Sequence, residues 1–219
     1  IIGAGTMGGG IAMSFANAGI PVTLIETSEE QLKRGMGVMQ KNYEATAARG
    51  GIPADAPAKR MGLITGVVGL ENVRDADLVI EAVFETMAVK KEVFEALDKH
   101  AKPGAVLASN TSYLNIDEIA KVTKRPQDVL GMHFFSPANV MKLCEIVRAD
   151  KTAPAALTTA VSIARKIAKV PAVVGVCDGF VGNRMLAQRG KQSEKLLFEG
   201  ALPQQVEACA HHLRLTAYA

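Results

Sequence analysis

Short runs of apolar, mostly β-branched residues alternate along the chain with longer stretches of helical periodicity. The short runs are typical of buried strands and lie at residues 22–25, 78–80, 106–108, 129–132, 143–147 and 173–176. The longer stretches predict helices at about residues 28–49, 86–100 and 154–169. Strands that alternate with helices at this spacing indicate a mostly parallel sheet covered on both faces. We therefore expect an α/β protein with a doubly wound sheet.

The pattern changes in the last part of the chain. Helix-forming residues dominate from Phe180 to Glu199, and Pro203 is suited to the first turn of another helix. We expect a first domain at residues 1–178 and the beginning of an all-helical second domain at residues 179–219. Because the chain opens on Ile1-Ile2-Gly3, the last residues of a predicted strand, we also expect both ends to be cut and the second domain to be truncated.

Composition and charge narrow the class of protein. Nearly half of the 219 residues are hydrophobic (48%), which is enough for a continuous core. The 25 basic and 22 acidic residues are spread along the chain, so no basic tract indicates a nucleic-acid partner. No apolar run approaches the roughly 20 residues of a membrane-spanning helix, so we expect no membrane span. Cys144, Cys177 and Cys209 match no zinc or redox spacing, and we expect no metal site and three buried thiols in a reducing compartment.

A glycine-rich segment, Gly3-Ala4-Gly5-Thr6-Met7-Gly8, fits the pattern G-x-G-x-x-G between a predicted strand and a predicted helix. In that pattern the glycines permit a tight turn, close approach of backbone to a pyrophosphate, and close packing of helix on strand. The N–H groups at the helix start then face the phosphates. Glu26 ends the next strand, where a carboxylate can bind ribose hydroxyls and repel a 2′-phosphate. We expect an NAD site; the plainer interpretation is a glycine-rich turn with a surface glutamate.

A histidine stands at the end of another predicted strand, in His133-Phe134-Phe135-Ser136-Pro137, at the edge where open α/β sheets place their ligands. Glu145 lies inside the apolar run at residues 143–147, where a carboxylate is costly unless it meets a partner. Histidine is suited to take an alcohol proton near neutral pH, and a buried glutamate can orient the ring and stabilise its cation. A lone histidine beside two phenylalanines is also common as a packed core residue, and from the residues alone the two interpretations stand about equal.

Five motifs follow one another in order: Gly3-Ala4-Gly5-Thr6-Met7-Gly8, Glu81-Ala82-Val83-Phe84-Glu85, Ser109-Asn110-Thr111-Ser112, His133-Phe134-Phe135-Ser136-Pro137 and Gly179-Phe180-Val181-Gly182-Asn183-Arg184. With these motifs, residues 1 to about 208 resemble the 3-hydroxyacyl-CoA dehydrogenase family, especially the dehydrogenase part of bacterial multifunctional fatty-acid oxidation proteins. The resemblance implies a Rossmann-type domain that binds NAD, followed by a helical domain. It also implies oxidation of (S)-3-hydroxyacyl-CoA to 3-oxoacyl-CoA in fatty-acid β-oxidation.

The resemblance implies roles at the reacting centre. His133 is the general base that takes the proton of the 3-hydroxyl, and Glu145 orients it. Ser112 hydrogen-bonds the substrate oxygen and borders the cofactor, and Asn183 supports the same oxygen from the second domain. The plainer interpretations are that Ser112 belongs to a polar turn and that Asn183 is a surface residue.

The resemblance implies further contacts around the centre. Glu85 and Lys90 match positions on the nicotinamide side of the cofactor, although they also suit a solvated helix start. Ser136 matches a cofactor contact, but many family members have asparagine there, so the contact is expected to be shorter or absent. Arg49 matches, through a weak alignment, a contact of the CoA moiety, and its plainer interpretation is a surface charge. The histidines without matching context, expected at the surface, are His100, His211 and His212.

The resemblance also implies partners and a location. We expect an acyl-CoA substrate, a homodimer formed through the missing helical domain, membership of a multifunctional β-oxidation protein, and a bacterial cytoplasmic location. With that domain missing, residues 1–219 are expected to bind NAD, to turn over acyl-CoA weakly or not at all, and to self-associate through the apolar face of residues 180–199. Two alternatives stay open: a non-catalytic NAD-binding relative, and another NAD-dependent β-hydroxyacid dehydrogenase with a lysine base.

Overall fold

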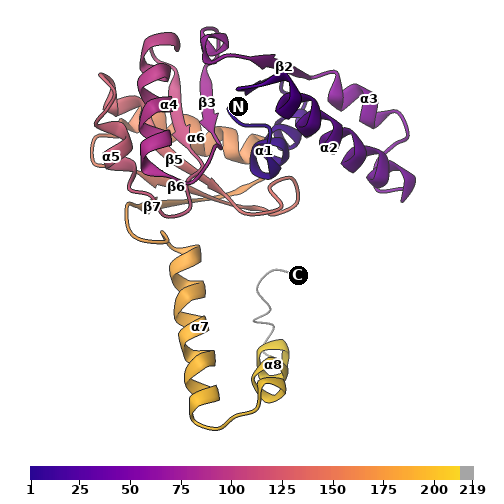
Figure 1. Ribbon diagram of the computed structural model, residues 1–219, viewed down its shortest axis with the longest axis vertical. Coiled ribbons are helices and arrows are strands. Elements are labelled where there is room, and N and C mark those ends of the chain that lie inside the picture. The colour runs from indigo at the N-terminus through magenta and orange to yellow at the C-terminus, as the bar shows by residue number, and fades with distance from the viewer. Residues whose placement is uncertain (213–219) are drawn as a thin grey trace.

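A mostly parallel sheet forms the centre of the computed structural model, which describes residues 1–212 (Figure 1). Residues 213–219 of the predicted second domain lie outside the described residues. Ile2 forms parallel bridges to Ile25 and Glu81 and so joins two groups of strands. In spatial order the strands are β2 (Ile64–Val68), β1 (Val22–Glu26), β3 (Leu78–Glu81), β4 (Val106–Ser109), β5 (Val129–Phe134), β6 (Leu143–Arg148) and β7 (Val170–Gly175).

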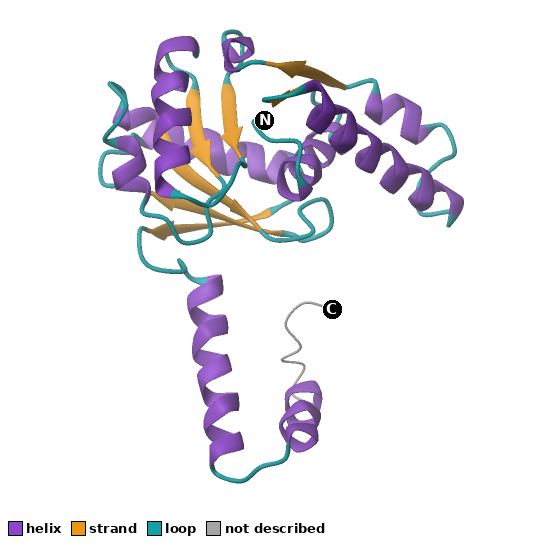
Figure 2. Ribbon diagram, in the orientation of Figure 1, coloured by secondary structure: helices purple, strands orange, loops and turns teal. Residues whose placement is uncertain are grey.

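The strand directions confirm the predicted α/β class. The pair β5–β6 is antiparallel, while β1–β2, β3–β4, β4–β5 and β6–β7 are parallel. Helices cover both faces, as Figure 2 shows: α1 (Thr6–Asn17), α2 (Glu29–Ala48) and α6 (Pro154–Lys166) on one face, and α4 (Met87–His100) and α5 (Ile116–Ala120) on the other. The short helices are α3 (Ala56–Met61), η1 (Leu70–Val73) and η2 (Pro126–Asp128).

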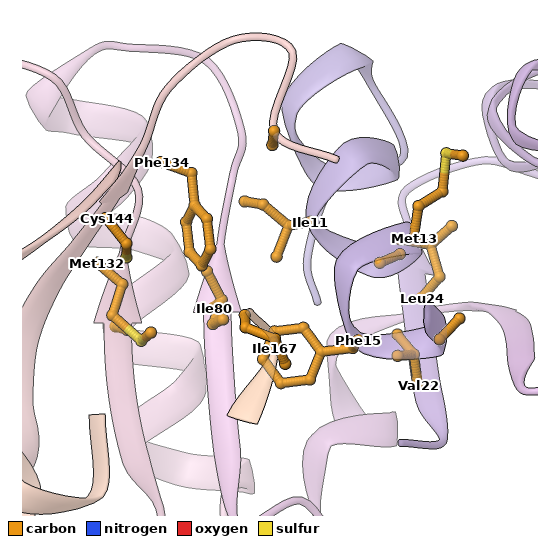
Figure 3. Close-up of a cluster of buried hydrophobic side chains, with 14 of the residues drawn as sticks. Ile11, Met13, Phe15, Val22, Leu24, Ile80, Met132, Phe134, Cys144 and Ile167 are labelled. Atoms are coloured by element: carbon orange, nitrogen blue, oxygen red, sulfur yellow. The ribbon is translucent and has the colours of Figure 1, made fainter. Parts of the chain in front are cut away.

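Each face of the sheet has its own apolar core, because successive strand residues point to opposite faces. Ala108 of β4 packs with α1 and α6, whereas its neighbour Leu107 packs with α4 and α5. Figure 3 shows the first of these cores, to which α1 contributes Ile11 and Phe15 and β5 contributes Phe134. Burial on both faces explains why the strands are continuous apolar runs in the sequence.

Most predicted elements are present, with shifted ends. Ser28 caps α2 by accepting the Gln31 N–H. The helix predicted at residues 154–169 ends at Lys166, because Ala168 has φ of +59° and leaves the helical region. β7 therefore begins at Val170, earlier than predicted.

The chain after β7 is helical but packs little. Helices α7 (Gly182–Phe198) and α8 (Pro203–His212) have no buried residue, and α7 extends away from the sheet (Figure 1). The predicted domain boundary at Asp178–Gly179 falls in the segment before α7 and stays a prediction. None of the helices in the described part of the chain is long and apolar enough to span a membrane.

The prediction of three buried thiols is wrong. Cys144 of β6 is buried, Cys177 is half-buried, and Cys209 of α8 is exposed. Cys209 follows the exposure of α8, which has no buried residue. Within residues 1–212, no group of three histidine, cysteine or acidic side chains is arranged to hold a metal ion.

Candidate active site

The glycine turn opens helix α1 without a side-chain cap. Gly3 has φ of +95°, in the left-handed region, and a Cβ on Gly8 would lie 1.8 Å from the Gly3 carbonyl oxygen, so the turn needs glycine at both positions. Gly5, the N-cap of α1, has nothing within 4 Å of where a Cβ would stand. Thr6 and Met7 begin the helix at this opening, and no acidic residue lies in its first turn. Open space in front of free helix N–H groups fits a pyrophosphate.

Glu26 stands at the carboxyl end of β1, beside this turn. Its Oε1 accepts the Ala4 N–H at 2.8 Å, and its Oε2 accepts the Thr27 N–H at 2.9 Å. A cavity of about 280 Å³ adjoins Glu26 between the ends of β1, β2 and β3. An apolar cavity with a carboxylate at its wall fits a nucleoside, with the base inside and the ribose hydroxyls at the carboxylate. Its apolar lining includes Ile25, Val68, Leu70 and Val83.

His133 and Glu145 form a buried pair across the antiparallel strands β5 and β6, where they stand directly opposite each other. His133 Nδ1 lies 2.8 Å from Glu145 Oε2, and the two residues are 3% and 1% exposed. Glu145 Oε1 accepts two further hydrogen bonds, from the N–H groups of Gly182 at 2.8 Å and Val181 at 3.0 Å. Burial alone would raise the pKa of Glu145, but these hydrogen bonds outweigh it and hold its pKa below the ordinary value.

The pairing fixes how the imidazole can act. An ionised carboxylate only accepts hydrogen bonds, so His133 donates its Nδ1–H to Glu145. In the neutral imidazole, Nε2 then keeps its lone pair. The ring lies against two aromatic rings, with centroids 4.4 Å from Phe135 and 5.7 Å from Phe180. Phe180 is fully buried and comes from the segment that leads into α7. An imidazole held in this way has a nitrogen that can accept a proton, and Phe135 and Phe180 shield its ring.

Ser112 lies in a turn held by Glu85. Glu85 Oε1 accepts the Ser112 N–H at 2.7 Å and the Thr111 hydroxyl, while Lys90 Nζ lies 3.2 Å from Glu85 Oε2. Partial burial raises the pKa of Glu85, but the Thr111 hydroxyl, the Lys90 charge and the Ser112 N–H together lower it below its ordinary value. Asn110 links this turn to β5, since its Oδ1 accepts the Phe134 N–H at 2.9 Å.

Ser136 is exposed in the loop that follows β5, and a buried lysine holds that loop. Lys169 Nζ donates to the carbonyl of Met141 at 2.8 Å and to that of Ala138, which also accepts the Ser14 hydroxyl of α1 at 3.1 Å. Burial lowers the pKa of Lys169. The loop is thereby fixed between α1 and the start of β7, close to both the glycine turn and His133.

The two remaining candidates lie in different places. Asn183 is partly buried on the first turn of α7, directly after Gly182, whose N–H binds Glu145, so its backbone lies near the His133–Glu145 pair. Arg49 is exposed at the C-terminal end of α2, which extends away from β5 and β6 (Figure 1). The structure therefore does not bring Arg49 to the pair. His100, His211 and His212 are exposed, as predicted.

One charged residue near the site is not predicted from the sequence. Glu81, the last residue of β3, is fully buried and contacts Lys90 Nζ at 2.7 Å. Lys90 is buried too, which contradicts the interpretation of a solvated helix start for this residue. The signal was available, since Glu81 ends an apolar strand just as Glu145 lies within one, and the same argument of a costly buried carboxylate applies to both.

Comparison with known proteins agrees with this geometry. The sequence model of the family described as "3-hydroxyacyl-CoA dehydrogenase, NAD binding domain" matches residues 1–177. A peroxisomal bifunctional enzyme of Danio rerio is 45% identical over 207 residues, which cover 94% of this chain and 28% of that protein. The fatty acid oxidation complex subunit alpha of Psychrobacter cryohalolentis is 38% identical over 201 residues, which cover 92% of this chain and 28% of that protein. The chain thus spans little more than a quarter of the length of these relatives.

Solved structures give the same result. The crystal structure of (S)-3-hydroxybutyryl-CoA dehydrogenase from Ralstonia eutropha has a TM-score of 0.90 at 30% identity, and the match covers 93% of this chain and 72% of that one. The matched sequence, the doubly wound sheet and the uncapped glycine turn agree with one another. The chain therefore belongs to the 3-hydroxyacyl-CoA dehydrogenase family and carries its NAD-binding domain.

Proposed function

We propose that the chain carries out the NAD-dependent oxidation of (S)-3-hydroxyacyl-CoA to 3-oxoacyl-CoA, a step of fatty-acid β-oxidation. The observation that carries the proposal is the buried His133–Glu145 pair at the carboxyl end of β5. Oxidation of an alcohol requires a base to take the hydroxyl proton, whereas binding of NAD without catalysis does not.

NAD, when bound, supplies the hydride acceptor for the carbon that bears the hydroxyl. The N–H groups at the start of α1, around Gly5, would hold its pyrophosphate. Glu26 would hold the adenosine ribose beside the apolar cavity, and its negative charge would disfavour NADP. Glu85, with Lys90 beneath it, and Ser136 would border the nicotinamide end.

The chain's own residues then handle the proton of the substrate. His133 Nε2 takes the proton of the 3-hydroxyl, and Glu145 stabilises the resulting imidazolium through the 2.8 Å contact at Nδ1. The Ser112 hydroxyl and the Asn183 amide are proposed to donate hydrogen bonds to the substrate oxygen and so to hold the alcohol in reach of Nε2. Arg49, exposed and without an ion pair among the described residues, is proposed to contact the CoA moiety.

The direct test follows NADH absorbance after the chain is mixed with NADH and acetoacetyl-CoA, the reverse reaction. We expect NADH to be consumed, weakly if residues 1–219 lack the helices that close over the substrate, and we expect NADPH to support less turnover. Titration of the same sample with NAD by calorimetry separates binding from catalysis. NAD binding without turnover would favour a non-catalytic relative. Turnover of β-hydroxy acids that lack CoA would favour another NAD-dependent β-hydroxyacid dehydrogenase.

Partners and location follow the same proposal. The exposed apolar residues of α7 and the exposed Leu202 after it support a contact of this part with another helical surface, in a homodimer or within a multifunctional β-oxidation protein. The relatives include enzymes named as peroxisomal and a subunit of a bacterial complex, so the cytoplasmic location stays a prediction.

A further inference from the structure

A compact group of charges lies at the carboxyl ends of β3 and β4, apart from the His133–Glu145 pair. Glu81 is fully buried, and its carboxylate accepts hydrogen bonds from Lys90 Nζ at 2.7 Å, Ser109 Oγ at 2.7 Å and the Val83 N–H at 2.8 Å. Lys90 Nζ also lies 3.2 Å from Glu85 Oε2. Two carboxylates and one ammonium share this group, so as ionised groups they carry one net negative charge.

Glu85 presents that charge to the outside. The Glu85 side chain is 41% exposed, whereas those of Lys90 and Glu81 are 1% and 0% exposed. Because the charges of the buried residues Glu81 and Lys90 offset each other, Lys90 does not cancel the charge of Glu85. Without the Glu81 carboxylate, the same ammonium would neutralise Glu85.

The position of this group relative to a bound dinucleotide follows from the strand order. The glycine turn and the cavity at Glu26 lie at the ends of Ile2 and β1, and His133 lies at the end of β5. A dinucleotide that has its adenosine at Glu26 and its reacting ring beside His133 crosses the carboxyl ends of β3 and β4. Those are the ends where Glu85 stands.

We infer that the Glu81–Lys90–Glu85 group sets the preference of the site between the two redox forms of the nicotinamide. Its single net negative charge stabilises the oxidised ring, which is cationic, relative to the reduced ring, which is neutral, and the partly buried setting keeps this interaction from being fully screened. Glu81 acts as a positioning residue: it holds Lys90 and balances its charge. The inference rests on the proposed NAD site and extends it to a residue that need not touch the cofactor.

The test compares dissociation constants for NAD⁺ and NADH, measured separately by calorimetry on the 219-residue chain. Glu81→Gln keeps the shape of the side chain but leaves the group neutral, so the ratio of the NADH constant to the NAD⁺ constant is expected to fall about fivefold. The double variant Glu81→Gln with Lys90→Met restores one net negative charge on Glu85, so the ratio is expected to return toward the wild-type value. If Glu81 had a purely structural role, its loss would weaken the binding of NAD⁺ and of NADH alike, and both would bind still more weakly to the double variant.

A matched control and a second variant complete the experiment. Glu118→Gln removes an equal charge from α5, where Glu118 pairs with Lys91 and Lys121, and it is expected to leave the ratio unchanged. Glu85→Gln changes a half-exposed carboxylate and is expected to lower the ratio as Glu81→Gln does, which keeps the test open if Glu81→Gln does not fold. A ratio that stays at the wild-type value in both single variants overturns the inference. A ratio in the double variant that is as low as the ratio in Glu81→Gln also overturns it.

Failure of the underlying proposal would look different. A wild-type chain that binds neither NAD⁺ nor NADH would remove the proposed cofactor site and the inference with it. The chain could instead bind NAD⁺ and NADH, with the ratio of their dissociation constants changing in the variants as expected, and yet not reduce acetoacetyl-CoA. That result would leave the inference intact and remove only the proposed substrate.

Discussion

The sheet domain and the pair of helices after it are stabilised in different ways. The sheet carries an apolar core on each face, whereas α7 and α8 bury no side chain, and Phe198 at the end of α7 is 91% exposed. The two parts meet at a polar joint, where the first N–H groups of α7 bind Glu145. The packed part thus builds the His133–Glu145 pair, and the helical part is oriented on it through these backbone hydrogen bonds and through the buried ring of Phe180 just before α7.

This difference indicates what each part needs from its surroundings. The sheet domain has the buried surface that folding requires, while an exposed apolar helix face usually marks an interaction surface. Met185, Leu186, Leu196, Leu197 and Leu202 share this exposure with Phe198. We therefore expect the sheet domain to determine cofactor binding and the reacting pair, and the helices to determine association. Paired substitutions, one in each part, test this division.

The largest expected effect is on turnover. His133→Gln is expected to lower turnover of a 3-hydroxyacyl-CoA by roughly 10²–10⁴-fold, because it removes the general base, while the dissociation constant for NAD stays nearly unchanged. His211→Gln on α8 is the matched change in the helical part, and we expect no effect from it on turnover. Steady-state rates and NAD titrations on the same samples measure both. Near-normal turnover of His133→Gln would show that this pair is not the proton acceptor.

The second test compares two phenylalanines by stability. Phe180→Ala is expected to lower the free energy of unfolding by about 3–5 kcal/mol, because Phe180 is fully buried against His133 and the core. Phe198→Ala is expected to change it by less than about 0.5 kcal/mol, as exposed substitutions usually do, and to reduce self-association. Urea unfolding and sedimentation measure the two quantities. Equal losses in the two variants would mean that α7 is packed in solution.

How far the sequence predicts the structure differs between the same two parts. The strands with both faces covered were predictable as apolar runs, and the costly carboxylate at Glu145 pointed to its partner. The edge strand β2 was missed because Gly66 and half-exposed residues interrupt its pattern. The N–H groups of Val181 and Gly182 were missed as site members because they are far from Glu145 in the sequence and meet it only through the fold. Glu81, in contrast, was detectable as a carboxylate that ends an apolar strand.

The third test compares two helical glycines. Gly8→Ala is expected to destabilise the sheet domain by about 3 kcal/mol and to weaken NAD binding, because the new methyl group meets the Gly3 carbonyl at 1.8 Å and must displace the turn. Gly190→Ala in α7 has no atom within 4 Å of the new methyl group and is expected to increase helicity, since alanine is favoured over glycine by about 1 kcal/mol in a helix. Thermal unfolding and circular dichroism provide the measurements. Tolerance of Gly8→Ala would contradict the glycine requirement argued for the turn.

The smallest expected effect tests the joint between the two parts. Glu145→Gln is expected to lower the free energy of unfolding at neutral pH by about 2 kcal/mol, because it weakens charge-assisted hydrogen bonds to His133, Val181 and Gly182. The pKa of Glu145 is held below its ordinary value in the folded chain. Its contribution is therefore present above the unfolded-state pKa, about 4.3, and is lost as the pH falls through the lower folded-state pKa.

The stability difference between wild type and Glu145→Gln should accordingly be constant near neutral pH and shrink only below about pH 4. Glu199→Gln at the end of α7 is the matched control, because its contact with Lys195 at 3.6 Å is exposed and exposed pairs contribute little. Hydrogen exchange at the Val181 and Gly182 amides separates the joint from general destabilisation: Glu145→Gln should speed exchange there at neutral pH more than at Ile146 in β6. Equal acceleration at all three amides would mean that Glu145 stabilises the sheet alone, and that the orientation of α7 depends on something other than this carboxylate.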